Sequence, residues 1–213
     1  LQSLGIGSPF GLYVSPENKN SSQYLTTVIQ SGITLPDRDY YLEEDEKYVA
    51  ARQTLTRYIR RIYELAELED GEKASSSILD LESKLAAIQW ERTELRDAEK
   101  RYNKFAVSEL SELTPENSWD HFFTAAQVGM IQDVNIATPS FFEDLQELLS
   151  QTPLSVWKSY LTFQLLDGFA PLLTQPFVDA HFELHSKELA GVPELKPRWK
   201  RGVDAVAGAG AGD

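Results

Sequence analysis

The amino-acid sequence predicts a mainly α-helical fold, a multi-helix array with at most one short two-stranded element. Two observations carry this prediction. Apolar residues recur at the i, i+3, i+4, i+7 spacing of one helix face through most of the chain, and proline, glycine and cap residues divide the pattern into helices of ordinary length. With 213 residues, of which 42% are hydrophobic and 25% charged, the chain is long enough to bury a sizeable core.

The first 30 residues are expected to form one short strand and one helix. Residues 4–14 combine glycine with β-branched and aromatic residues, a composition typical of a loop and a short strand. Ser21 or Ser22 can cap a helix, which we expect to run to about Gln30.

The segment 30–42 is predicted to end that helix and to begin another. Gly32 can adopt the positive φ that terminates a helix. Pro36 has a φ suited to a first helical turn and lacks the N–H that such a turn leaves unpaired. Asp37 and Asp39 would then lie in the first turn, where the helix dipole favours acidic side chains.

Two long helices are expected next, over residues 43–69 and 73–100, with a break at Gly71. In each, apolar side chains form a stripe opposite charged residues, and the short link between them predicts an antiparallel pair. The apolar positions are Tyr48, Leu55, Ile59, Ile62, Leu65, Ala66 and Leu68 in the first, and Ile78, Leu81, Leu85, Ile88 and Leu95 in the second.

Shorter helices are expected to fill the second half of the chain. Helix starts are indicated at Ser108, at Asn117 or Ser118, at Thr138-Pro139 and at Thr152-Pro153, and a last helix is expected over 176–189. Residues 132–138 alternate in hydrophobicity and predict a short strand. The alanine- and glycine-rich residues 207–213 predict a low-complexity tail or a truncated junction, with 1–206 forming the folded part.

Charge and composition exclude several classes of function. The net charge of −13 argues against nucleic-acid binding, which needs a cationic surface. The chain has no cysteine, and therefore neither disulfides nor thiolate metal sites. No apolar run reaches the length of a membrane span, and no signal peptide is visible in the sequence.

His181 and His185 are the most conspicuous candidate metal ligands. Their i, i+4 spacing places both imidazoles on one helix face, as in helices that bind Zn²⁺. A metalloprotease helix carries its general-base glutamate directly after the first histidine, and Phe182 occupies that position here. Glu183 lies on the other side of the helix, and no third ligand is evident. We therefore reject the two histidines as a catalytic pair; ordinary structural histidines or an adventitious metal pair remain the alternatives.

Three arginines are candidates for contact with a peptide carboxylate, because a guanidinium can bind a carboxylate through two hydrogen bonds. Arg92 and Arg96 belong to the mixed-charge run 91–101, which also reads as a solvated helix face with internal ion pairs. Arg198 belongs to the run Pro-Arg-Trp-Lys-Arg at 197–201, for which a structural role is the alternative.

Several motifs, in order, resemble one protein family. These are Leu35-Pro36-Asp37-Arg38-Asp39-Tyr40-Tyr41, Leu79-Asp80-Leu81-Glu82-Ser83-Lys84-Leu85-Ala86, Arg92-Thr93-Glu94-Leu95-Arg96-Asp97 followed by Tyr102-Asn103-Lys104, the segment 153–161, and Pro197-Arg198-Trp199-Lys200-Arg201. In order and spacing they resemble the N-terminal helical region of the neprilysin-like zinc metalloendopeptidases, which include neprilysin, endothelin-converting enzyme and bacterial oligopeptidases of the O type. The resemblance covers about residues 4–206.

The resemblance implies a function that this chain does not perform alone. In the family, zinc is bound by a His-Glu-x-x-His helix and a downstream glutamate in a C-terminal catalytic domain, so we expect the ligands of the parent enzyme's zinc to lie outside this chain. The chain would be most of a helical lid that faces the catalytic domain and restricts entry to small peptides. Its partners would be the catalytic domain, or a C-terminal fragment of the same enzyme, and the oligopeptide substrate. The resemblance also implies a secreted bacterial enzyme, extracellular or periplasmic. The alternative is a stand-alone acidic helical module that binds a protein partner.

Overall fold

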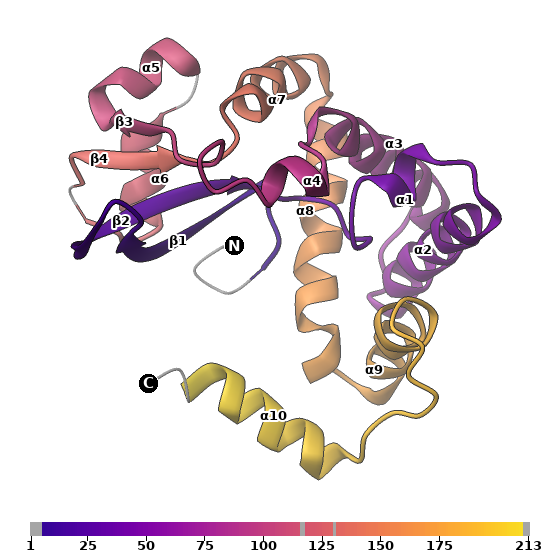
Figure 1. Ribbon diagram of the computed structural model, residues 1–213. Coiled ribbons are helices and arrows are strands. Elements are labelled where there is room, and N and C mark those ends of the chain that lie inside the picture. The colour runs from indigo at the N-terminus through magenta and orange to yellow at the C-terminus, as the bar shows by residue number, and fades with distance from the viewer. Residues whose placement is uncertain (1–5, 116–117, 130, 211–213) are drawn as a thin grey trace.

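The computed structural model of the chain describes residues 6–115, 118–129 and 131–210, whose elements form two groups (Figure 1). A four-stranded sheet with short helices around it lies on one side of the molecule, and a bundle of longer helices lies on the other. Helix α8 (Leu154–Phe169) runs between the two groups.

The sheet is mixed and has the strand order β1-β2-β4-β3. Strands β1 (Phe10–Glu17) and β2 (Asn20–Gln30) form an antiparallel hairpin. Strand β4 (Asp133–Ile136) pairs in parallel with β2, and β3 (Lys104–Ala106) pairs antiparallel with β4. The predicted strand over 132–138 is thus present, in the interior of the sheet.

The prediction of an all-helical array with at most one two-stranded element is therefore wrong. The largest error is β2, where a helix capped by Ser21 or Ser22 was expected. Residues 24–29 are Tyr-Leu-Thr-Thr-Val-Ile, and such aromatic and β-branched side chains favour a strand, which outweighs the isolated cap signal. Strand β3 has only three residues and pairs with a strand 30 residues further along the chain, so no local pattern indicated it.

An aromatic cluster covers one face of the sheet. Phe10 of β1 lies 6.1 Å from Trp119 and 4.9 Å from Phe122 in ring-centroid distance, both on α6 (Trp119–Ala125), and 5.5 Å from Phe142 on α7 (Pro139–Gln151). Helix α6 follows Ser118, one of its two predicted caps; the other, Asn117, lies outside the described residues. Helix α5 (Leu110–Leu113) and a short 3-10 turn over Val107–Glu109 complete this side.

The bundle consists of α1 (Asp39–Leu42), α2 (Glu46–Leu65), α3 (Gly71–Ile88) and α8, with α4 (Arg92–Leu95) after α3. The two long helical patterns are confirmed as α2 and α3, although α3 ends at Ile88 and Gly71 is its first residue. Helix α1 begins three residues after Pro36. The largest fully buried side chains of the bundle are Leu55, Ile59, Ile62, Ile78, Leu81, Leu85, Tyr160 and Phe163.

The C-terminal part turns back along the bundle and then leaves it. A 3-10 turn (Ala170–Leu172) leads into α9 (Gln175–His181), which continues as a π-helical segment, η4 (Phe182–Glu188). Helix α10 (Arg198–Gly210) stands apart from the bundle along most of its length (Figure 1). The predicted tail is helical through Gly210, and 211–213 lie outside the described residues. No described helix is long and apolar enough to cross a membrane.

A buried carboxylate joins the 33–41 segment to the bundle. Glu82 of α3 is fully buried and accepts hydrogen bonds from the backbone N–H and the hydroxyl of Thr34, at 3.2 and 2.6 Å. Its carboxylate also accepts from the hydroxyl of Tyr41 and, at 3.2 Å, from Nε2 of Gln164 on α8. Burial raises the pKa of Glu82 to about 7, although hydrogen bonds from Thr34 and Tyr41 oppose this shift.

The turn at Gly32 fixes the other end of this segment. Gly32 has φ of +94°, and an added Cβ would lie 2.7 Å from Cα of Pro9. Its carbonyl accepts a hydrogen bond of 2.9 Å from the hydroxyl of Tyr160, which comes from α8. The glycine therefore serves as predicted in supplying a positive φ, but it ends a strand instead of a helix.

The raised pKa of Glu82 predicts a pH-dependent stability. The folded state holds the proton of Glu82 more tightly than the unfolded chain, so its stabilising contribution is complete below the unfolded pKa of about 4.5 and is lost as pH rises through about 7. Between pH 4.5 and 7.5 we expect the wild type to lose about 2–3 kcal/mol of unfolding free energy relative to Glu82→Gln. Urea unfolding at both pH values measures this difference. The exposed Glu64→Gln is the control, and parallel pH profiles of wild type and Glu82→Gln would contradict the prediction.

Candidate functional site

The junction groove, formed where residues 30–39 meet residues 89–95, is built from two of the segments that the sequence singled out. It has a volume of about 550 Å³. One wall comes from the end of β2 and the loop after it, and the other from the segment after α3 together with α4. Its lining includes Gln30, Asp37, Arg38, Trp90, Glu91 and Arg92.

Amide side chains hold the two walls together. Gln30 accepts from the backbone N–H of Trp90 at 2.8 Å and donates to its carbonyl at 3.1 Å. Gln89 donates to the carbonyl of Ser31 at 2.8 Å. The indole N–H of Trp90 donates to the hydroxyl of Ser140 at 2.8 Å, which attaches the groove to α7. The two glutamine side chains thus satisfy backbone groups that would otherwise need partners from the opposite wall, about 60 residues away in the sequence.

Two ion pairs cross the groove. Arg38 lies 3.4 Å from Glu91, and Arg92 lies 3.4 Å from Asp37. Each wall therefore supplies one arginine and one acid. Nε of Arg38 is buried and forms no hydrogen bond with any described residue.

The structure does not gather the three candidate arginines at one place. Arg92 lines the junction groove, and its side chain is 68% exposed. Arg96 follows α4 and is exposed outside the residues that line the groove. Arg198 begins α10 and lines a separate depression with Pro171 and Leu172. Only Arg92 therefore combines exposure with a position in this groove.

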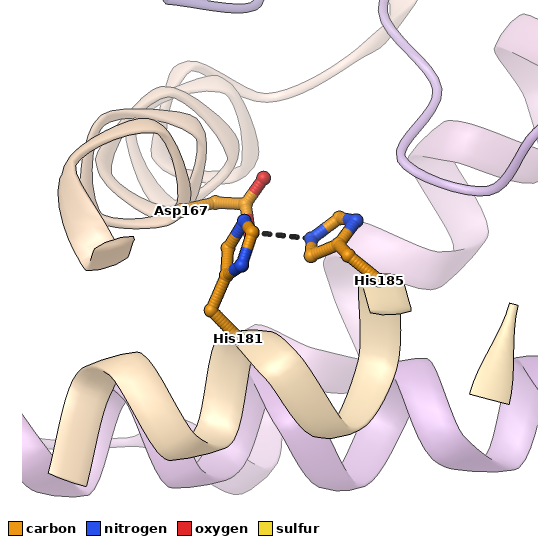
Figure 2. A group of neighbouring side chains, drawn as sticks. All are labelled: Asp167, His181 and His185. Carbon is orange, nitrogen blue, oxygen red and sulfur yellow. Dashed lines mark hydrogen bonds and ion pairs between the residues drawn. The ribbon is translucent and has the colours of Figure 1, made fainter. Parts of the chain in front are cut away.

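A second cluster brings the two histidines to a carboxylate. Figure 2 shows His181 and His185 projecting from one helical segment towards Asp167, which lies on α8. Nε2 of His185 is 2.8 Å from Oδ1 of Asp167, and the ring centroids of the histidines are 4.2 Å apart. Tyr58 of α2 donates its hydroxyl to the same Oδ1 at 2.6 Å. Sequence reasoning missed Asp167 and Tyr58, although Asp167 is the only acid of the apolar helix α8.

The environment sets the protonation of this cluster. Burial, together with the neighbouring His185, lowers the pKa of His181 to about 4, so that imidazole is neutral near pH 7. Burial alone would raise the pKa of Asp167, but the hydrogen bond and charge of His185 hold it below its usual value. The cluster thus presents a neutral imidazole beside a carboxylate at neutral pH.

The cluster does not fit the zinc chemistry of a metalloprotease helix. Phe182 occupies the position of the general base. Glu183 is exposed and paired with Lys187 at 2.9 Å, so it does not address a cation between the histidines. We derive no catalytic step from these residues.

Comparisons with known proteins place the chain in a family. A family model described as Peptidase family M13 matches residues 1–211. The chain is 30% identical over 201 residues to human endothelin-converting enzyme 1, covering 90% of this chain and 26% of the relative. It is also 30% identical over 191 residues to mouse endothelin-converting enzyme-like 1, covering 85% of this chain and 24% of the relative.

Solved structures agree with this placement. The open state of the zinc metalloprotease Zmp1 of Mycobacterium tuberculosis superimposes with a TM-score of 0.90 at 30% identity, covering 99% of this chain and 33% of that one. Its inhibitor complex gives a TM-score of 0.91 at the same identity. PepO from Lactobacillus rhamnosis, 16% identical with a TM-score of 0.78, shares the fold.

The chain thus spans about a quarter of these curated relatives and a third of the Zmp1 chain. Its sequence motifs, its fold and the family match over residues 1–211 agree, and the chain belongs to peptidase family M13, to the N-terminal region of these neprilysin-like zinc metallopeptidases.

Proposed function

We propose that this chain is the substrate-gating part of a zinc-dependent metalloendopeptidase that hydrolyses oligopeptides. The observation that carries the proposal is the match of nearly the whole chain to one third of a zinc metalloprotease, at a TM-score of 0.90. The remaining two thirds of such an enzyme would supply the catalytic domain and the zinc ligands. The chain alone is then inactive, and its partners are that domain and the peptide.

The surface of α10 supports a role beside a further domain. Trp199, Val203 and Val206 recur at i, i+4 and i+7, so they share one helix face, and they are 67%, 60% and 73% exposed. An apolar stripe of this kind on a helix that stands apart from its own bundle is suited to contact with another protein surface. The family resemblance makes the catalytic domain the proposed partner, in an extracellular or periplasmic enzyme of bacterial origin.

Gating predicts a strong dependence on substrate size. We expect the complete enzyme to cleave a fluorogenic peptide of about ten residues, and to cleave the same sequence within a folded protein at least about 100-fold more slowly in kcat/KM, a barrier difference of about 2.7 kcal/mol. A zinc chelator should abolish cleavage and added Zn²⁺ restore it. The 213-residue chain serves as the control and should show no cleavage. Equal rates on peptide and folded protein would contradict gating, and activity of the chain alone would contradict the assignment of the zinc ligands.

Arg92 is the proposed peptide-facing residue that the structure makes testable; Arg96 and Arg198 remain further candidates. If Arg92 binds a substrate carboxylate, Arg92→Gln in the complete enzyme should raise KM by roughly three- to tenfold with little change in kcat, because an exposed charged hydrogen bond contributes about 1 kcal/mol to binding. Arg61→Gln is a matched control, since Arg61 is also exposed and paired with a glutamate on its own helix at 2.6 Å. Blocking the carboxyl terminus of the peptide should abolish the difference. An unchanged KM for Arg92→Gln would remove Arg92 from substrate binding.

A further inference from the structure

We propose that Asp167, His181 and His185 form a binding site for a divalent first-row transition metal ion, with Zn²⁺ as the cation that best suits the donors. The inference concerns the side chains of this chain and does not depend on the proposed peptidase function. It also assigns no catalytic role to the ion.

The geometry brings three metal ligands together from two helical segments. One ligand atom of each of Asp167, His181 and His185 lies within 4.8 Å of the others. Tetrahedral coordination of Zn²⁺ with bonds of about 2.0–2.2 Å separates donor atoms by about 3.4 Å. Atoms as far apart as 4.8 Å would therefore approach by about 1.4 Å, and Nε2 of His185 and Oδ1 of Asp167, now 2.8 Å apart, would separate by about 0.6 Å. Rotation about side-chain torsions supplies such a shift, because all three side chains are only partly buried.

Coordination capacity is left unused within the described part of the chain. The imidazole of His181 forms no hydrogen bond there, although burial has removed much of its hydration. Asp167 accepts both of its hydrogen bonds at Oδ1, from Tyr58 and in the contact with His185. A cation between the rings would give His181 a partner and would replace the proton that now joins His185 to Asp167.

The donor set selects the class of ion. Two imidazole nitrogens suit Zn²⁺, Co²⁺, Ni²⁺ and Cu²⁺, whereas Mg²⁺ and Ca²⁺ prefer sites made of oxygen ligands. Three protein ligands leave a fourth position for water, and the side chains of His185 and Asp167 are 24% and 16% exposed, so the ion has a path from solvent. No cysteine competes for the metal.

Tyr58 gives the site an outer shell. Its hydroxyl bonds to Oδ1 of Asp167 at 2.6 Å, and its ring meets that of His185 edge-on at a centroid distance of 5.7 Å. A hydrogen bond to a ligating carboxylate fixes its orientation, and loss of such an outer partner typically weakens metal binding by about 10–100-fold. Tyr58 belongs to α2, so the ion would connect α2, α8 and the segment from α9 to η4.

The local backbone is unusual where the ligands lie. His181 ends α9, and His185 lies within the π-helical segment η4 (Phe182–Glu188). Such π-helical turns are rare and occur frequently at functional sites. A metal ion bound by His181 and His185 would connect the end of α9 to η4 across this transition. We therefore expect a structural ion that fastens the C-terminal segment to α8.

Metal content tests the proposal directly. The protein is stripped with a chelator, dialysed against Zn²⁺ and analysed for bound zinc. Wild-type protein should bind one zinc more than His181→Gln and Asp167→Asn, and zinc bound elsewhere cancels in this comparison. Tyr58→Phe should retain the site with about tenfold weaker affinity. His121→Gln is the matched control, because His121 lies on α6, away from the cluster, and is hydrogen-bonded to Ser118. This variant should bind zinc as the wild type does.

Thermal unfolding supplies a second readout. At a Zn²⁺ concentration about 100 times the dissociation constant, the midpoint of wild-type unfolding should rise by about 5–10 °C, and the midpoint of Asp167→Asn should not. Asp167→Asn keeps an acceptor for Tyr58, so it guards against failure of His181→Gln to fold. Mg²⁺ should leave the midpoint unchanged. Equal zinc contents of wild type and both ligand variants would overturn the proposal, and so would an equal stabilisation by Mg²⁺.

Discussion

The carboxylate of Glu82 is the constraint on which the rest of this structure depends. A fully buried carboxylate is costly unless hydrogen bonds replace its hydration. Here the compensating donors come from Thr34, Tyr41 and Gln164, which belong to the 33–41 segment and to α8. Satisfying Glu82 therefore fixes the path of the segment and its distance from α3. Because Asp37 and Arg38 lie on the same segment, this interaction also determines where one wall of the junction groove stands.

Helix α8 contacts elements of both groups. The hydroxyl of Tyr160, in the middle of α8, donates to the carbonyl of Gly32, just after the end of β2. Asp167, near the C-terminal end of α8, is hydrogen-bonded to Tyr58 and His185. The helix thus touches both the segment that forms the groove and the histidine cluster. Metal binding at that cluster, as we propose, would act on the same helix that holds the groove segment. The clusters are nonetheless separate in their chemistry: one is built from arginine–carboxylate pairs, the other from imidazole and carboxylate.

Family membership concerns the whole enzyme, whereas the chemistry of the histidine pair concerns this chain alone. The match to M13 peptidases places the chain in a zinc enzyme family, yet the histidine pair of this chain lacks the general base of a metalloprotease helix. The family therefore suggests what the whole enzyme does, whereas this region supplies the arginine–carboxylate pairs of the junction groove and, as we propose, a surface for a further domain.

The sequence by itself determined the family, through several motifs in a fixed order. It also determined the long helices and the starts of α6, α7 and α8, because helical spacing and cap residues act over a few neighbouring positions. It also contained a signal that was overlooked: Glu82 lies on the apolar stripe of Ile78, Leu81 and Leu85, which predicts a buried acid. Only the tertiary structure decided the mixed sheet, because β2 and β4 pair across more than 100 residues. The same holds for the pairing of Arg38 with Glu91 and for the meeting of Asp167 with His181 and His185. Such contacts depend on how separate elements pack, and the residues of one segment carry no local record of them.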